Sequence, residues 1–148
     1  MNSKRTAQVF FDSSVLFSAI YSQTGGSHKL LELVRKGDLE GFTSQTVIDE
    51  LKDNLYKFSP KTKVEINSFI KESKLIVRER IAQDEIKPHL KTVEKKDAHV
   101  LAGAISTGCK YLVTLDKKHL NNPEVIQRVG QFVILAPKEL LRKLGRNG

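Results

Sequence analysis

Residues 95–120 read KKDAHVLAGAISTGCKYLVTLDKKHL, and this stretch decides the fold of the chain. An acid, Asp97, precedes apolar residues at helical spacing, and Gly108 then supplies a helix stop. Residues 111–115 form an apolar strand pattern that Asp116 follows directly. A helix followed at once by a buried strand is typical of proteins in which crossover helices connect parallel strands. Both acids are thus expected where helix and strand meet.

The same alternation continues outside this stretch. Four further short strands are predicted, at residues 8–11, 40–43, 75–77 and 132–135. Apolar residues at helical spacing fill most of the intervals, with helix starts expected at Ser44, Pro60 and Pro137. Residues 78–94 are the exception, because charge is mixed with apolar residues and Pro88 interrupts any long helix. We predict an α/β fold of three layers: a central parallel sheet of about four to five strands with helices on both faces.

The length and composition are those of one packed domain. The chain has 148 residues, of which 39% are hydrophobic and 28% charged, near the averages of globular proteins. No repeat or linker divides it, so we expect a single domain over residues 1–148, with residues 145–148 as a frayed tail.

Four acids occupy the predicted junctions between strand and helix. Asp12 ends the first strand, Glu50 lies in the helix after Ser44, and Asp97 and Asp116 bracket the later helix and strand. Each has a structural explanation: Asp12 and Asp97 as helix caps, Asp116 as a turn residue, and Glu50 on a solvated helix face. Parallel strands collect such residues at one sheet edge, where α/β proteins bind ligands. The four together favour a shared site.

Clustered carboxylates require a cation. They raise one another's pKa and repel unless a positive ion neutralises them, and Mg²⁺ or Mn²⁺ prefers oxygen ligands. A bound ion of this kind activates water and stabilises charge on phosphorus. Ser13 and Thr114, each near one of the acids, are expected to orient carboxylates as supporting donors.

The charge balance favours a polyanionic partner. The chain carries 25 Lys and Arg against 17 Asp and Glu, a formal net charge of +8. Lys95 and Lys96 precede Asp97, and two more lysines, Lys117 and Lys118, follow Asp116. Basic side chains around an acidic centre would suit a nucleic-acid substrate.

The remaining special residues point to no other chemistry. A single cysteine, Cys109, cannot form an internal disulfide. With no signal-like leader and no apolar run long enough to span a membrane, a cytoplasmic location is expected. The histidines show no zinc-ligand spacing and are interpreted as structural or surface residues: His28, His89, His99 and His119.

At these residues the chain resembles the PIN-domain nucleases, especially their small prokaryotic toxin-like members. The resemblance extends from about Val9 to Leu141. It is carried by VFFDSSVL, the helix with VIDEL, KKDAHVLAGAISTGCKYLVTLDKKHL and the late segment ILAPKELL. It departs at Ser14, where the family often has Asn or Thr, and at His119 and Leu120, where an acid or aromatic residue is common.

The resemblance implies a specific activity. Asp12, Glu50, Asp97 and Asp116 would be the acidic quartet of a Mg²⁺-dependent or Mn²⁺-dependent endoribonuclease, which cuts RNA by a metal-activated water. It also implies a small antitoxin protein as a partner and a homodimer. Two other hypotheses remain: a PIN-like module that binds RNA or protein without cutting, and a phosphotransfer or phosphatase domain. The second would need another acid beside Asp12.

Overall fold

The computed structural model describes residues 6–58 and 63–145, with the backbone alone for residues 63 and 64. At its centre is a five-stranded sheet whose strands are all parallel, in the order β3-β2-β1-β4-β5. The strands are β1 (Ala7–Phe11), β2 (Leu39–Ser44), β3 (Ile76–Arg78), β4 (Tyr111–Val113) and β5 (Val133–Leu135). The predicted α/β fold and its parallel sheet are confirmed.

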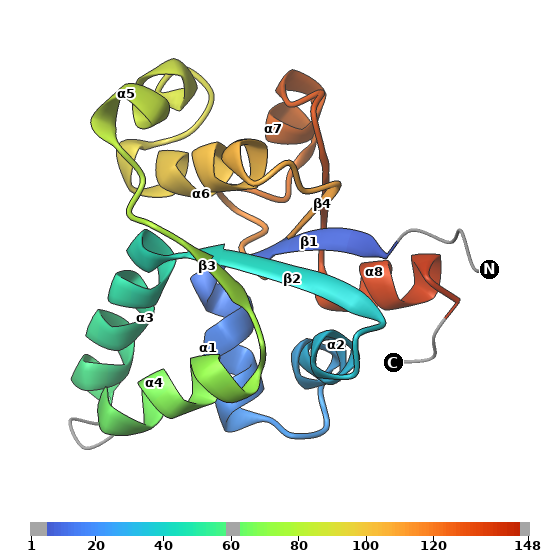
Figure 1. Cartoon of the computed structure of the whole chain (residues 1–148). Coiled ribbons are helices and arrows are strands. Elements are labelled where there is room, and N and C mark those ends of the chain that lie inside the picture. Colours follow the sequence, from blue (N-terminus) through green and yellow to red (C-terminus); the bar gives the residue numbers. More distant parts are fainter. Residues whose placement is uncertain (1–5, 59–62, 146–148) are drawn as a thin grey trace.

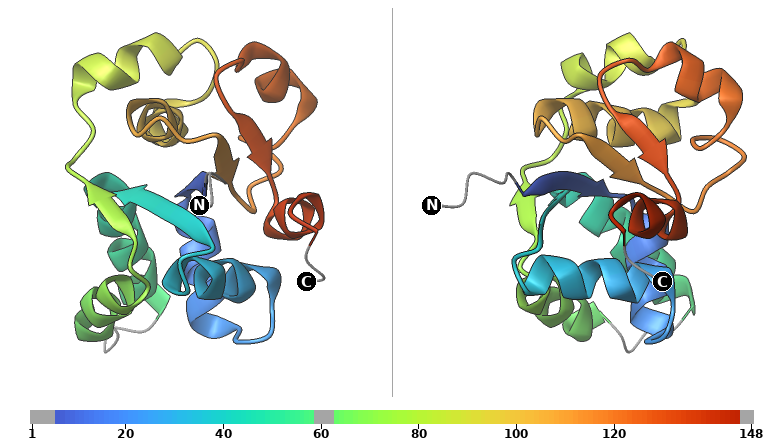
Figure 2. Two further views of the ribbon diagram at one scale, coloured as in Figure 1. Left: turned by 45° about the vertical axis from the view of Figure 1, so that its right-hand side comes forward. Right: turned by 90° about the vertical axis from the view of Figure 1, so that its right-hand side faces the viewer.

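Helices cover both faces of the sheet (Figures 1 and 2). One face carries α1 (Ser13–Tyr21), α2 (Gly26–Arg35), α3 (Gln45–Phe58) and α4 (Lys63–Glu72). The other carries α5 (Gln83–Ile86), the 3₁₀ helix η2 (Lys87–His89), α6 (Lys95–Ser106) and α7 (Pro123–Arg128), while α8 (Pro137–Lys143) packs against α2. Right-handed crossovers explain this division, because the chain first advances from β1 to β3 and then returns to β4 and β5 on the other side.

The strand order reverses between β1 and β4. These two strands are neighbours, and the Asp12 backbone N–H donates to the Val113 carbonyl at 3.2 Å where they end. In open α/β sheets this switch point leaves a crevice at the carboxyl ends of the strands, which is the usual ligand position. The fold therefore brings Asp12 next to the residues that follow β4.

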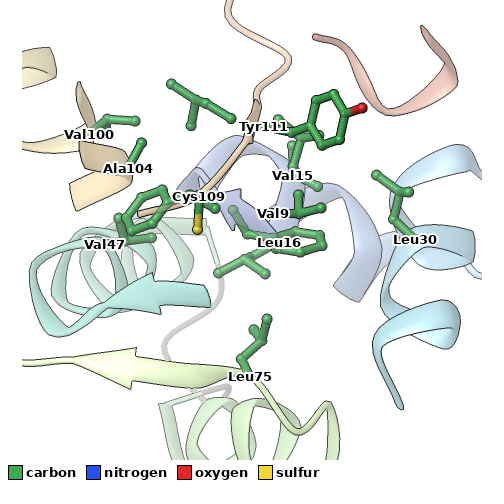
Figure 3. Close-up of a cluster of buried hydrophobic side chains, with 14 of the residues drawn as sticks. Val9, Val15, Leu16, Leu30, Val47, Leu75, Val100, Ala104, Cys109 and Tyr111 are labelled. Carbon is green, nitrogen blue, oxygen red and sulfur yellow. The ribbon is translucent and has the colours of Figure 1, made fainter. Parts of the chain in front are cut away.

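The core is built around β1. Val9, Phe10 and Phe11 are fully buried, as expected for a central strand covered on both faces. Figure 3 shows side chains from the strands, from α1 and α2, and from α6 meeting in this core. Gly103 lets α6 approach the sheet, because a Cβ there would lie 2.5 Å from Phe10 Cζ.

Several local predictions can be compared with the structure. Ser44 caps α3 as predicted, since its Oγ accepts the Val47 N–H at 3.1 Å. The short helices α5, η2 and α7 were not expected from their mixed composition. Pro60 and most of the tail at residues 145–148 lie outside the described residues. Among the helices described, none has the length and apolar character needed to cross a membrane.

Candidate active site

Asp12 is held rigidly at the end of β1. Its Oδ1 accepts the Ser13 backbone N–H at 2.8 Å, and its Oδ2 accepts the hydroxyls of Thr114 at 2.7 Å and Ser14 at 3.0 Å. The residue is only 5% exposed. Burial raises the pKa of Asp12, and the Thr114 and Ser14 hydroxyls partly oppose that rise. The carboxylate is thus oriented by three donors in a largely dry environment.

Thr114 connects Asp12 to Asp116. The buried Thr114 hydroxyl donates to Asp12 and accepts the Asp116 backbone N–H at 3.1 Å. A second link runs from the Leu115 N–H to the Ser14 hydroxyl at 3.0 Å. The ends of β1 and β4 therefore form one hydrogen-bonded unit with Thr114 at its centre.

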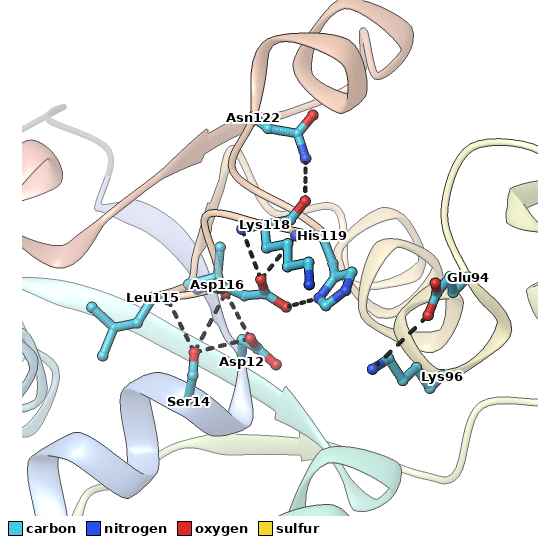
Figure 4. A network of polar contacts seen from close by, with 10 residues as sticks. Asp12, Ser14, Glu94, Lys96, Leu115, Asp116, Lys118, His119 and Asn122 are labelled. Carbon is cyan, nitrogen blue, oxygen red and sulfur yellow. Dashed lines mark hydrogen bonds and ion pairs between the residues drawn. The ribbon is translucent and has the colours of Figure 1, made fainter.

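Both carboxylate oxygens of Asp116 have partners in the turn that follows it. Its Oδ1 accepts the backbone N–H groups of Lys118 at 3.0 Å and His119 at 2.9 Å, and its Oδ2 lies 3.2 Å from His119 Nδ1. Figure 4 shows the Asp116 carboxylate and the imidazole side by side, above Asp12. Asp97, in the first turn of α6, completes a group in which one ligand atom from each of Asp97, Asp116 and His119 lies within 4.8 Å of the others.

Asp97 has a buried oxygen with no hydrogen-bond partner. This atom is Oδ2, and it is unpaired among residues 6–58 and 63–145. Burial and the neighbouring charge of Asp116 raise the pKa of Asp97, with a smaller opposing effect from His119 and Lys96. A buried carboxylate oxygen that accepts no hydrogen bond is costly, so this position is suited to a cation.

Glu50 reaches the same cluster from α3. Its Oε1 accepts the Ser13 hydroxyl at 2.8 Å and lies 3.7 Å from His99 Nε2. Burial alone would raise the pKa of Glu50, but the interactions with His99 and Ser13 outweigh it and the pKa is lowered. The Glu50 charge in turn acts on both Asp12 and Asp97. The four predicted acids therefore form one electrostatic cluster, brought together from four separate segments.

The four predicted lysines differ in position. Lys96 is close enough to favour the charged forms of Glu50 and Asp97, although its ammonium also lies 3.9 Å from Glu94. Lys117 and Lys118 follow Asp116 and line two separate grooves. Lys95 is exposed at the first residue of α6.

Sequence patterns missed three residues that shape this site. Ser14 bonds Asp12 across a tight turn, His99 lies beside Glu50 with 6% exposure, and His119 lies beside Asp116. His99 had no visible signal, because its contact depends on how α6 packs near α3. The three-residue interval from Asp116 to His119 was a usable signal, since a turn at that spacing brings the side chains together.

These residues fit a hard divalent cation. Carboxylate oxygens are the ligands that Mg²⁺ and Mn²⁺ prefer. Asp97 and Asp116 each contribute a carboxylate oxygen to the group. Hydrogen bonds would hold the Asp116 and Asp12 carboxylates in place before an ion arrives.

We expect Thr114→Val to loosen this unit. The substitution keeps the shape but removes the donor to Asp12 and the acceptor of the Asp116 N–H, which should cost about 1–3 kcal/mol of stability. Urea unfolding measures this loss as a lower free energy of unfolding. Thr114→Ser is the matched control. It keeps the hydroxyl and removes one buried methyl group, which should lower the free energy of unfolding by roughly 1 kcal/mol. Equal stability of the valine variant and the wild type would contradict the assigned hydrogen bonds.

Comparison with known protein families gives a match over most of the chain. The profile described as "PIN domain" matches residues 8–118, which contain all four acids. The chain belongs to the PIN domain family. PIN domains are nucleases, so the acids converge in a fold used for phosphodiester hydrolysis. No curated protein matches the chain.

Solved structures of PIN proteins share this fold at low sequence identity. A chain of VapBC2 from Rickettsia felis, solved with a DNA fragment from its promoter, is 20% identical, with 87% of this chain and 98% of that chain covered and a TM-score of 0.62. A chain of a toxin-antitoxin complex from Klebsiella pneumoniae is 16% identical, with 87% of this chain and 97% of that chain covered and a TM-score of 0.59. VapC20 from Mycobacterium tuberculosis, a toxin that cleaves the sarcin-ricin loop, is 14% identical. The match covers 74% of this chain and 91% of that chain, with a TM-score of 0.55.

Proposed function

We propose that this PIN domain is a Mg²⁺-dependent or Mn²⁺-dependent endoribonuclease that acts as the toxin of a toxin-antitoxin pair. One observation carries the proposal: carboxylates from four segments converge at the switch point of the sheet, and one of their oxygens, Asp97 Oδ2, is buried without a partner among the described residues. The family match supports the nuclease class.

The side chains divide the chemistry between them. Asp97 and Asp116 would hold the ion, with Asp12 and Glu50 completing the acidic surround. The bound ion would supply a low-pKa water and neutralise charge on the scissile phosphate. Asp12 is kept in one orientation by Thr114, so little rearrangement is needed when substrate binds. The lowered pKa of Glu50 keeps its carboxylate ionised at neutral pH, so Glu50 would contribute a fixed negative charge beside the ion rather than a strong base.

Two grooves beside the acids would hold the RNA backbone. The α8 groove, of about 720 Å³, contains Lys117 together with Lys138 and Arg142. The α7 groove, of about 440 Å³, contains Lys118 and His119. Because residues 115–119 separate the grooves and include Asp116, a strand bound along both would pass the acids. Cations in such grooves contact phosphates regardless of base sequence.

We expect Lys117→Glu to weaken RNA binding. Charge reversal in the α8 groove should raise the Kd for single-stranded RNA about tenfold and lower the slope of log K against log salt by about 1 or more. Fluorescence anisotropy of a labelled RNA measures the Kd. Both proteins carry Asp97→Asn, so that the RNA is not cut during the titration. Lys110→Glu, at the amino end of β4 and hence on the opposite sheet edge, is the matched control. An unchanged salt slope for Lys117→Glu would remove the α8 groove from the RNA path.

The partner proposed is a small antitoxin protein. Two of the structural relatives above are complexes that contain an antitoxin or its promoter DNA. This chain exposes an aromatic cluster at the ends of α1 and α3, in which Phe58 contacts Phe17 and Tyr21 with ring centroids 5.9 and 5.1 Å away. Phe58 is 68% exposed, so a protein partner that covered it would bury substantial apolar area. A homodimer, as the resemblance implies, is also proposed.

Metal-dependent cleavage tests the function directly. The purified chain should cut labelled single-stranded RNA with Mg²⁺ or Mn²⁺ and lose all activity in EDTA, with recovery on adding excess ion. Single-stranded DNA of the same sequence separates an RNase from a general nuclease. RNA that is bound but never cut, with either ion, would favour a non-catalytic binding module instead.

A further inference from the structure

His119 is positioned like a metal ligand. Its Nδ1 lies 3.2 Å from Asp116 Oδ2. One ring nitrogen of His119 and one carboxylate oxygen from each of Asp97 and Asp116 lie within 4.8 Å of one another. The His119 backbone N–H also bonds Asp116 Oδ1 at 2.9 Å, so the turn fixes the imidazole and the carboxylate relative to each other. The ring is about a quarter exposed, which leaves one side of the group open to the α7 groove.

The spacing of these atoms suits one ion. Ligand bonds of about 2.0–2.1 Å place adjacent ligand atoms about 2.8–3.4 Å apart over octahedral and tetrahedral sites, and opposite atoms of an octahedral site about 4.0–4.2 Å apart. The Nδ1 to Oδ2 distance of 3.2 Å falls in the first interval. All three ligand atoms lie within 4.8 Å of one another, so small movements of the side chains would bring them to one ion.

A simple hydrogen bond between His119 and Asp116 explains less. It accounts for the 3.2 Å contact, but it leaves Asp97 Oδ2 buried and without a hydrogen bond among the described residues. A cation held by the three side chains would bind the Asp97 carboxylate, which carries that unpaired oxygen, and the His119 imidazole together. The unpaired Asp97 oxygen favours an ion in this group, and the place of His119 in the same group favours its imidazole as one of the ligands.

We propose that His119 Nδ1 is a direct metal ligand, and that the site consequently prefers Mn²⁺ or a similar transition-metal ion over Mg²⁺. This inference rests on the proposed metal-dependent function and specifies its cofactor. Imidazole binds first-row transition ions well, whereas Mg²⁺ strongly prefers carboxylate, carbonyl and water oxygen. The preference would arise from a nitrogen ligand that this chain carries three residues after Asp116.

Pulsed EPR of the full chain loaded with Mn²⁺ alone tests the ligand without any substrate. A directly bound imidazole gives a ¹⁴N coupling to the manganese, and His119→Asn should abolish it. His28→Asn is the matched control, because His28 lies on α2 in a separate pocket with Ile20 and Leu55. By calorimetry, His119→Asn should weaken Mn²⁺ binding at least about tenfold and change Mg²⁺ binding less than about threefold.

The outcomes separate this inference from the nuclease proposal. Wild-type protein that cleaves RNA with metal but shows no ¹⁴N coupling, or keeps the full coupling in His119→Asn, overturns the His119 ligand and leaves the nuclease intact. Equal losses of Mn²⁺ and Mg²⁺ affinity in His119→Asn overturn the metal preference. Coupling that His119→Asn removes, in a protein that never cuts RNA, supports the ligand and counts against the nuclease.

Discussion

Asp97→Asn is expected to reduce RNA cleavage at least about 10³-fold while leaving the fold intact. The substitution neutralises the carboxylate whose buried Oδ2 has no partner among the described residues, and so removes a central ligand from the metal group. Loss of a metal that stabilises transition-state charge costs several kcal/mol, and each 1.36 kcal/mol is about tenfold in rate. Initial rates on a labelled RNA with excess Mn²⁺ measure the loss.

The same variant should be more stable than the wild type without metal at neutral pH. Burial and Asp116 raise the pKa of Asp97 above its unfolded value, so its contribution favours folding only below the unfolded pKa and is lost as pH rises through the folded pKa. Asparagine has no such charge to bury. The stability gain of Asp97→Asn should therefore shrink as the pH falls toward about 4, which thermal unfolding in EDTA at several pH values measures.

Asp53→Asn is the matched control for both effects. Asp53 lies on the exposed face of α3, outside the cluster, so neither cleavage nor metal binding should change. Cleavage by Asp97→Asn within tenfold of the wild type would remove Asp97 from the site. A loss of stability at neutral pH would contradict the electrostatic repulsion instead, and the two readouts separate these failures.

Gly103→Val is expected to destabilise the protein by about 3 kcal/mol or more. The first added atom would lie 2.5 and 2.8 Å from ring carbons of the fully buried Phe10, and valine adds two further methyl groups. Overpacking of a dense core commonly costs about 1–3 kcal/mol and occasionally more. Relief would require α6 to move away from β1, which would also carry Asp97 away from Asp12. Cleavage should fall together with stability.

Two controls isolate the packing effect. Gly130→Val places the same side chain in open space with no atom within 4 Å of the added Cβ, and should change stability by less than about 0.5 kcal/mol. Combining Gly103→Val with Phe10→Leu should recover part of the loss, because the smaller side chain leaves room for the methyl groups. A Gly103→Val protein as stable as the wild type in urea would show that α6 does not pack this closely.

The parallel sheet was predictable because its information is local. Short apolar strands alternated with amphipathic helices, and parallel strands can be connected in no other compact way. The stretches that were not predicted, α5, η2 and α7, are short and owe their form to the surrounding packing. Ser14 and His99 were missed for a related reason, since their partners lie on other segments of the chain.

By itself, the sequence determined where the acids stand relative to the strands and helices. Asp12, Asp97 and Asp116 stand at strand and helix ends because the alternation of apolar and polar residues sets those ends. Only the tertiary structure decided that the strand order reverses between β1 and β4, that Thr114 joins Asp12 to Asp116, and that His119 turns toward Asp97. Hydrophobic periodicity is a property of neighbours along the chain, whereas hydrogen-bond partners and charge clusters depend on packing between distant segments.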